Sequence, residues 1–147
     1  MMTLQHKFVD HVPDVMVQGI LYVSIPYCTA MHLCVCGCGN EVVTPISPTD
    51  WQLKFDGKSI SLNPSIGNWN FECQCHYWIV KNEVRYAAKW DKEEIARGRM
   101  NERKRKNEYY DERQVVQEKA LVENQKNNKK SIFEFFKSIL TYFKFNN

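Results

Sequence analysis

Two groups of cysteines are the clearest candidates for chemistry in this chain. The first lies in "CVCGCGN" and the second in "CQCH", about thirty-five residues later. A structural zinc ion takes four sulfur or nitrogen ligands, commonly delivered as two close pairs. Two glycines in the first group would let the chain fold tightly around an ion. The residue types and spacing therefore predict metal binding, with buried thiols or a redox pair as the alternatives. The candidate ligands are Cys34, Cys36, Cys38, Cys73, Cys75 and His76.

A serine in "NPSIGN" is the second candidate. Asn63-Pro64 and Gly67-Asn68 flank Ser65, and we expect a sharp turn that holds its hydroxyl away from a sheet. Such a serine acts as a nucleophile when a histidine lies close enough to take its proton. His76 is the nearest histidine along the chain. The same residues are also typical of an ordinary loop, so spacing alone favours the loop.

The composition divides the chain into two parts. Residues 1–90 hold six Lys or Arg against seven Asp or Glu, whereas residues 91–147 hold fourteen against ten, so the net charge of +3 comes from the tail. All prolines, cysteines, histidines and tryptophans fall in the first part. These residue types mark turns, strands and sites. We expect residues 1–90 to form a zinc-binding β domain with the active site, and 91–147 to form a charged helical tail.

Short β-branched and aromatic runs predict the strands of the first part. "WQLKFDGKSISL" alternates apolar and polar residues on both sides of Asp56-Gly57, so it predicts a hairpin with a two-residue turn. A second hairpin pairs 76–80 with 83–87 across Lys81-Asn82. The predicted fold class is mainly β, α+β overall: a small antiparallel sheet of about six strands, stabilised by zinc. The other predicted strands lie at 20–25 and 40–46.

The tail reads as helix in two stretches. Residues 91–130 are rich in Glu, Lys, Arg and Gln, with sparse apolar positions, which indicates a solvated helix frayed around Gly98 and Asn127-Asn128. Its basic cluster at 103–106 is interleaved with acids, so we do not expect nucleic-acid binding. "SIFEFFKSILTYFKF" begins with a capping box at Ser131 and Glu134 and predicts an amphipathic helix over 131–145. That helix would pack on the core, on a copy of itself, on a partner or on a membrane surface.

The chain shows no signal-peptide pattern and no apolar run long enough to span a bilayer. We expect a cytoplasmic protein. Thiols stay reduced in that compartment, which favours metal binding over disulfides and makes zinc the expected ion. Cys28, alone after a proline and an aromatic residue, is expected to be an ordinary buried residue.

Residues 32–87 resemble a small bacterial protein family encoded beside ubiquitin-like proteins in Bub-type operons. The blocks that carry the resemblance are "CVCGCGN", "PTDW", "FDG", "PSIGNW" and "HYWI", in the family's order and spacing. It implies a peptidase that trims a ubiquitin-like precursor or removes the ubiquitin-like protein from its conjugates. The implied partners are that protein and its conjugates, with the operon's activating and conjugating enzymes as further candidates.

Carried over by position, the resemblance implies that Ser65 is the nucleophile and His76 the base. It implies a zinc site whose ligands are Cys34, Cys36, Cys38 and Cys73. Where the family pattern has a serine, this chain has Cys75, so Cys75 is not expected to be an essential ligand.

This division of roles is chemically consistent. A thiolate-rich zinc has no open position and is structural, so acyl transfer would run through Ser65, with amides near Ile66 and Gly67 as oxyanion donors. Asp50 is the expected group that orients His76, because Asp56 belongs to the hairpin turn. One alternative is a metallohydrolase in which His76 binds the zinc. The other is a zinc adaptor that binds the ubiquitin-like protein without cutting it.

Overall fold

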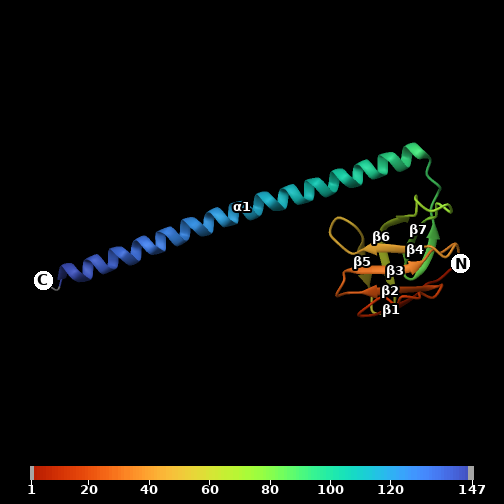
Figure 1. Ribbon diagram of the computed structural model, residues 1–147, viewed down its shortest axis with the longest axis horizontal. Helices are drawn as coiled ribbons and strands as arrows, with labels where there is room; N and C mark the ends of the chain where they lie inside the picture. Colours follow the sequence, from red (N-terminus) through yellow and green to blue (C-terminus); the bar gives the residue numbers. More distant parts are fainter. Residues whose placement is uncertain (1, 146–147) are drawn as a thin grey trace. The chain divides into compact units, whose positions relative to one another are not determined.

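The computed structural model describes residues 2–145, without the side chains of 131 and 133–145. Eight strands form two four-stranded sheets (Figure 1), which confirms the predicted mainly β fold class followed by a helix. The first sheet contains, in order, β1 (Gln5–Phe8), β2 (Ile20–Ser24), β3 (Thr29–Leu33) and β4 (Glu41–Pro45). The second contains β5 (Gln52–Phe55), β6 (Ile60–Gly67), β7 (His76–Val80) and β8 (Glu83–Tyr86).

Both sheets contribute to one hydrophobic core. In β4 the residues alternate, so that Val42 and Thr44 are buried while their neighbours are exposed, as expected for a strand with one face on a core. Burying a large apolar side chain contributes roughly 1.5 to 3 kcal/mol relative to leaving it exposed. The core residues include Leu21, Val23, Ala30 and Val42 from the first sheet and Ile60, Leu62, Ile66, Tyr77 and Ile79 from the second.

Two strands were not predicted, and the expected count of about six strands is too low. β1 is polar and half exposed, and it pairs with β2 in parallel, so the sheet is not antiparallel throughout. β3 reads "TAMHL", and its inward residues are Ala30 and His32. A small residue and a polar one give no apolar alternation, which is why the pattern missed this strand.

Both predicted hairpins form, but one turn differs from the prediction. Lys81 and Asn82 have positive φ angles of 51° and 67°, as a two-residue turn between β7 and β8 requires. The β5–β6 connection has four residues instead, because Phe55 pairs with Ile60. The carboxylate of Asp56 accepts hydrogen bonds from the amides of residues 58 and 59, which stabilises the longer turn.

The sharp turn predicted around Ser65 is wrong. β6 continues through Pro64 and Ser65 to Gly67 as a strand, paired with β7. The pairing shifts register between Leu62 and Ile66, which marks an irregularity of the bulge kind in front of Ser65. The irregularity next to Ser65 therefore lies within a strand and not in a loop. A bulge in a strand changes the direction in which nearby side chains point.

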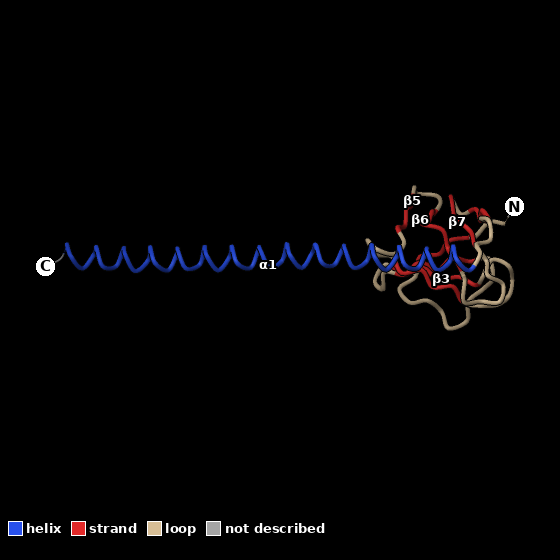
Figure 2. The backbone as a smooth tube through the Cα atoms, turned by 90° about the horizontal axis from the view of Figure 1, so that it is seen from above, coloured by secondary structure: helices blue, strands red, loops and turns tan. Residues whose placement is uncertain are grey.

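A single continuous helix, α1 (Lys92–Phe145), follows the sheets (Figure 2). Its first turn carries a capping box, in which the Asp91 carboxylate accepts from the Glu94 amide and the Glu94 carboxylate accepts from the Asp91 amide. The predicted fraying at Gly98 and at Asn127-Asn128 and the separate helix start at Ser131 are wrong, because α1 runs through these positions. The apolar face predicted for 131–145 lies outside the described side chains.

The first compact unit extends to Met100, ten residues beyond the boundary expected from composition. Within it, a methyl group on Gly98 would lie 2.7 Å from the Trp90 ring, and Arg99 donates to the Asn70 side chain at 2.8 Å. The first turns of α1 therefore belong to the unit that contains the sheets.

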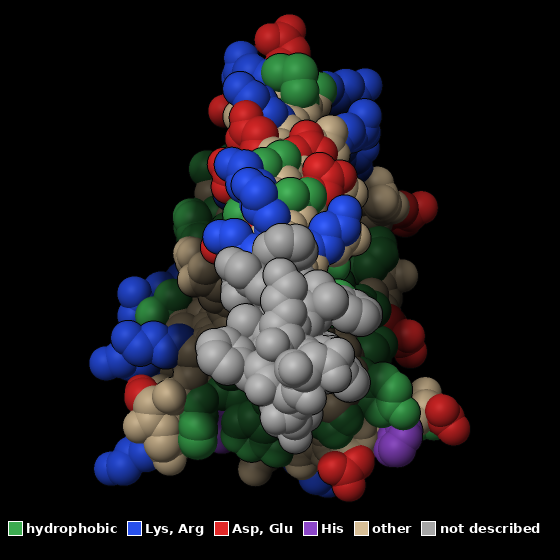
Figure 3. Space-filling view, turned by 90° about the vertical axis from the view of Figure 1, so that its left-hand side faces the viewer, with side chains coloured by type: hydrophobic (Ala, Val, Ile, Leu, Met, Phe, Trp, Pro, Cys, Tyr) green, Lys and Arg blue, Asp and Glu red, His purple; other side chains and the backbone are tan. Residues whose placement is uncertain are grey.

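The second unit, residues 101–147, contains the rest of α1, which ends at Phe145. Lys106 pairs with Glu102 at 3.1 Å and Lys104 with Glu108 at 3.8 Å, both one helical turn apart. Figure 3 shows Lys and Arg side chains beside Asp and Glu side chains on one face of the molecule. Such pairs contribute only about 0.3 to 0.5 kcal/mol each. No helix in the described part of the chain is both long and apolar enough to cross a membrane.

Candidate active site

Ser65 and His76 lie within hydrogen-bond distance of each other. Ser65 is on β6 and His76 begins β7, opposite Gly67 in the antiparallel pairing. The Ser65 hydroxyl and Nε2 of His76 are 3.0 Å apart. His76 is buried, with 5% of its surface exposed, whereas Ser65 is half-buried. The structure thus brings together the two residues expected to act as nucleophile and base.

The other ring nitrogen of His76 fixes the proton arrangement. Nδ1 lies 2.8 Å from the carbonyl oxygen of Ala88, which only accepts hydrogen bonds, so Nδ1 carries the proton and donates it. In the neutral ring Nε2 is then an acceptor, and the Ser65 hydroxyl donates to it. The Ala87 amide donates to the His76 carbonyl at 2.8 Å. The segment after β8 therefore holds both the main chain and the ring of His76.

Asp50 lies in the turn over residues 47–50, where its carboxylate accepts from the Ser47 hydroxyl at 2.7 Å. The structure therefore places a main-chain carbonyl, that of Ala88, against the nitrogen at which Asp50 was expected.

Three tryptophans surround the His76 ring. The ring centroids of Trp69, Trp78 and Trp90 lie 4.9, 5.7 and 5.0 Å from it, and Trp69 stacks on Trp90 at 5.3 Å. These bulky rings restrict the rotation of the imidazole and limit water around it. No pattern in the sequence predicts this arrangement, although "NWN", "HYW" and Trp90 all lie within residues 68–90.

Gly67 is required by the position of Trp69. A methyl group at residue 67 would lie 2.4 Å from two atoms of the indole ring, closer than real side chains approach. Trp69 therefore covers the backbone of Gly67, two residues after Ser65. The absence of a side chain at this position keeps the indole against His76.

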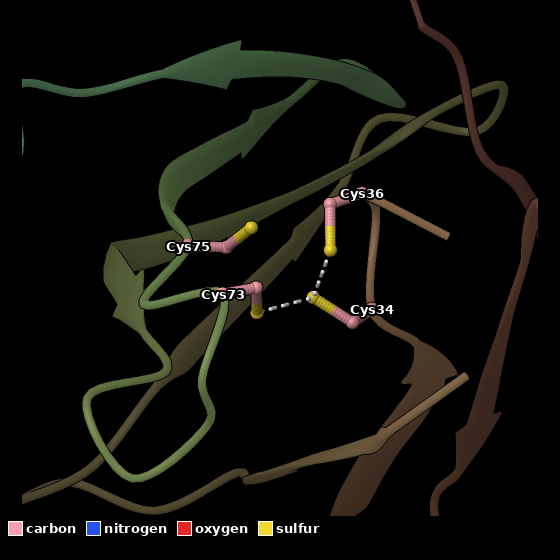
Figure 4. Close-up of side chains that lie close together, drawn as sticks. All are labelled: Cys34, Cys36, Cys73 and Cys75. Atoms are coloured by element: carbon pink, nitrogen blue, oxygen red, sulfur yellow. Dashed lines mark hydrogen bonds between the residues drawn. The ribbon is translucent and has the colours of Figure 1, made fainter. Parts of the chain in front are cut away.

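Four cysteines bring their sulfur atoms together, as Figure 4 shows. The four are Cys34, Cys36, Cys73 and Cys75, and their Sγ atoms all lie within 4.8 Å of one another. Gln74 has a positive φ of 46°, and it lies between two of them, while Gly37, with a φ of 82°, follows Cys36. These left-handed positions shape the two short segments that carry the thiols.

The spacing of the sulfurs fits a tetrahedral zinc ion. Sγ of Cys34 is 3.5 Å from that of Cys36 and 3.8 Å from that of Cys73. Four sulfurs about 2.3 Å from one zinc lie about 3.8 Å apart, so the donor set matches. Cys38 lies outside this group of four, although its sulfur is 3.8 Å from that of Cys73. The fourth member is Cys75, and Cys28 is exposed elsewhere, although it was expected to be buried.

The clustered thiols lie close enough together to change the pKa values of Cys34, Cys36 and Cys75, and a bound cation would favour their deprotonated forms. Burial raises the pKa of Cys34, and burial together with the neighbouring thiols raises the pKa of Cys75 to about 12. Burial also acts to raise the pKa of Cys36, but hydrogen bonds from the amide and thiol of Cys38 and from two neighbouring thiols lower it to about 6. Metal binding requires deprotonated thiols, so an ion would replace these mutual interactions.

Asn68 links the thiols to the buried core. Its side-chain amide nitrogen donates to the Cys34 sulfur and to the Tyr77 hydroxyl, both at 3.5 Å. That hydroxyl is 2.7 Å from Nε2 of His32, whose pKa is lowered by burial to about 4. Side chains that donate to ligand atoms orient them, so Asn68 is placed to support a metal site. This residue carries no signal in the sequence beyond its place in "GNW".

A small pocket of about 160 Å³ is lined in part by Ile66 and Gly67, which directly follow Ser65 in the chain. It is lined by residues 41–43 of β4, by Trp51 and by the 66–71 segment. One of its walls is Trp69, whose ring also contacts His76. The pocket is therefore formed in part by residues that lie next to Ser65 and His76.

Comparison with known proteins identifies the family. No curated protein and no solved structure gives a match. The model of the BubE family, described as a bacterial ubiquitination-like system serine protease, matches residues 8–87 and thus more than half of the chain. That range contains Ser65, His76 and all six cysteines. The chain therefore belongs to the BubE family of serine proteases of bacterial ubiquitination-like systems.

Proposed function

We propose that this protein cleaves the bond that follows the C-terminal residue of a ubiquitin-like protein, with Ser65 as nucleophile and His76 as base. The observation that carries the proposal is the 3.0 Å contact between the Ser65 hydroxyl and Nε2 of His76, in the acceptor form that Ala88 imposes. The family supplies the class of system. Such an activity would mature a precursor or release the ubiquitin-like protein from a target.

The proposed first step is attack by Ser65 Oγ on the substrate carbonyl carbon as its proton passes to Nε2 of His76. His76 then gives that proton to the leaving amine, and water releases the acyl group by the same route. The Ala88 carbonyl holds the ring in the required tautomer. A neutral acceptor stabilises the imidazolium less than a carboxylate does, because charge-assisted hydrogen bonds are stronger. Asp50→Ala tests whether that carboxylate adds to the rate.

Gly67 offers the main-chain donor for the oxyanion. The main-chain N–H of Asn68 donates to the Cys75 carbonyl. Alternate residues of a strand face the same partner, so Asn68 and Ile66 both direct their main-chain groups toward β7. The alternation turns the Gly67 amide to the opposite side, away from β7. We therefore assign oxyanion stabilisation to Gly67 and not to Ile66.

The thiol cluster is assigned a structural zinc, held by Cys34, Cys36, Cys73 and Cys75. Four thiolates leave no open position, so the ion would supply folding energy and no step of the reaction. It would fix the segment that leads directly into His76. Cys38 is the competing fourth ligand, because its sulfur also lies beside that of Cys73.

Substitution of the pair tests the proposal. Ser65→Ala and His76→Ala should each reduce cleavage of a ubiquitin-like protein with a C-terminal extension by about a thousandfold or more, since losses within one catalytic unit are large and do not add. Ser61→Ala is the matched control, because Ser61 lies on the same strand. Zinc content and melting temperature should stay unchanged in Ser65→Ala.

The outcomes separate the alternatives. An active Ser65→Ala beside a His76→Ala that has lost its metal would establish the metallohydrolase. A wild-type protein that binds the ubiquitin-like protein but cuts no precursor, conjugate or ester would establish the adaptor.

A further inference from the structure

The pocket beside the active site has a strand edge in each wall. One wall is formed by residues 41–43 of β4, the last strand of the first sheet, and the other by the 66–71 segment, which begins at the end of β6. Its volume of about 160 Å³ is far above the ~10 to 15 Å³ needed for one water molecule. The space suits a short length of peptide, whereas a folded element would not enter it.

The outer edge of β4 presents unused main-chain groups to this pocket. Cys34 donates to the Asn40 carbonyl and Ile46 donates to that of Cys28, so even-numbered residues of β4 face β3. Odd-numbered residues then face outward, and the Pro45 carbonyl accepts from Trp51 on that side. In the described part of the chain, no strand pairs with the outward groups of Glu41 and Val43.

The opposite wall belongs to the strand that carries the nucleophile. β5 pairs with β6 only as far as Asn63, so its partner strand has ended before Ser65. Gly67 has no side chain and turns its main chain to this open side. A peptide in the pocket would therefore lie between the edge of β4 and the residues that follow Ser65.

We propose that the substrate's C-terminal tail binds in this pocket in an extended conformation, as an added strand along the outer edge of β4. This inference rests on the proposed function and names how its substrate is held. Main-chain pairing gives affinity with little dependence on side chains. The Trp69 ring over Gly67 and the small volume restrict the tail to small residues next to the bond that is cut, so the substrate class is a tail ending in glycine or alanine.

A blocking variant tests the position of the tail. Val43→Trp would fill the pocket from the β4 side, and Val17→Trp is the matched control, because the two valines are 52% and 55% exposed. The probe is a fluorescent synthetic peptide with the C-terminal sequence of the ubiquitin-like protein, and binding is measured in a Ser65→Ala background. Val43→Trp should weaken binding about tenfold or more, the loss expected from removing one or two main-chain hydrogen bonds. Unchanged binding would overturn the inference.

A scan of the peptide main chain tests the strand pairing itself. Methylating one amide nitrogen at a time removes one donor without changing any side chain. Since alternate residues of a strand face its partner, binding should fall at every second position. Equal losses at all positions, or none, would contradict an added strand.

Hydrolysis of p-nitrophenyl acetate separates this inference from the proposed function. A small ester does not need the tail site, so its hydrolysis should depend on Ser65 and remain unchanged in the control Val17→Trp. If Val43→Trp still cuts the protein substrate with the wild-type KM, the tail site is rejected and the serine mechanism is not affected. Ester hydrolysis that is independent of Ser65 would reject the serine mechanism, while the peptide-binding results would still decide the tail site.

Discussion

The thiol cluster and the Ser65–His76 pair meet at the start of β7 but are built in different ways. Cys75 and His76 are consecutive, and the first belongs to the thiol cluster while the second belongs to the pair. The cluster brings together four thiols from two chain segments, an arrangement suited to holding one metal ion. The pair relies on strand register, a main-chain carbonyl and three aromatic rings. This difference predicts that substitutions in the cluster unfold the protein, whereas substitutions in the pair lower the rate of cleavage and leave the fold intact.

Removing a cysteine should have the largest effect. Cys73→Ser should abolish zinc binding and unfold residues 1–100, because binding energy at such a site is folding energy, with apparent values of about 10 to 16 kcal/mol. Elemental analysis and circular dichroism measure both. Cys28→Ser is the control, since Cys28 is exposed and does not belong to the group of four thiols.

The fourth ligand is decided by a matched pair of variants. Cys75→Ser should lose the metal, and Cys38→Ser should retain it, because Cys38 lies outside the group of four thiols. Loss of the metal in Cys38→Ser and its retention in Cys75→Ser would instead make Cys38 the fourth ligand.

Gly67→Ala should damage the pair and spare the cluster. The new methyl group would displace Trp69, whose ring lies within 2.4 Å of it. We expect kcat to fall about tenfold or more, and stability to fall by roughly 1 to 3 kcal/mol from overpacking. Zinc content should not change. Gly57→Ala is the control: its φ of 92° also disfavours alanine, but its methyl group would meet no atom within 4 Å, so only stability should decrease.

Tyr77→Phe should produce a smaller change, in stability alone. It leaves Nε2 of His32 and the Asn68 amide without the hydroxyl that joins them, and unpaired buried groups cost about 1 to 3 kcal/mol. Urea unfolding at neutral pH measures the loss. Tyr22→Phe, which removes a single longer contact to the Val17 amide, should cost less. A large fall in kcat would show that this network also positions the catalytic pair.

The smallest effect is expected at Asp56, outside both sites. Hydrogen bonds from the amide of Lys58 and from the hydroxyl and amide of Ser59 lower its pKa from 3.8 to about 2. Because the folded-state pKa is the lower one, this carboxylate stabilises the fold above pH 3.8, and the contribution is lost as the pH falls through about 2. Asp56→Asn should therefore flatten the melting temperature profile over that range.

The parts of the fold that the sequence predicts are those set by local residue patterns. Strict alternation and residues suited to positive φ predict both hairpins, and an Asp-Gly pair marks a turn even though its length came out longer. β1 and β3 lacked those signals, since their place depends on pairing with β2 and not on their own pattern. The helix start at Ser131 failed because a capping box inside a run of helix formers is not used as a start.

The candidate site is predictable to a different extent. The residue types and the family resemblance point to Ser65 and His76, and the structure places them together. The register shift that aims Ser65 depends on long-range pairing, so no local pattern indicates it. Cys75 was set aside because of a departure from the family pattern, yet spatially it completes the group of four thiols.

The orienting group of His76 is a main-chain oxygen, and every amino acid at position 88 supplies one. Mutational scanning would therefore recover Ser65 and His76 as intolerant positions and pass over residue 88. A proline at position 87 would instead remove the amide that donates to the His76 carbonyl and loosen the same segment. Under the proposed mechanism, the genetic footprint of the site would be that of a dyad, although the Ala88 carbonyl is a third group that builds it.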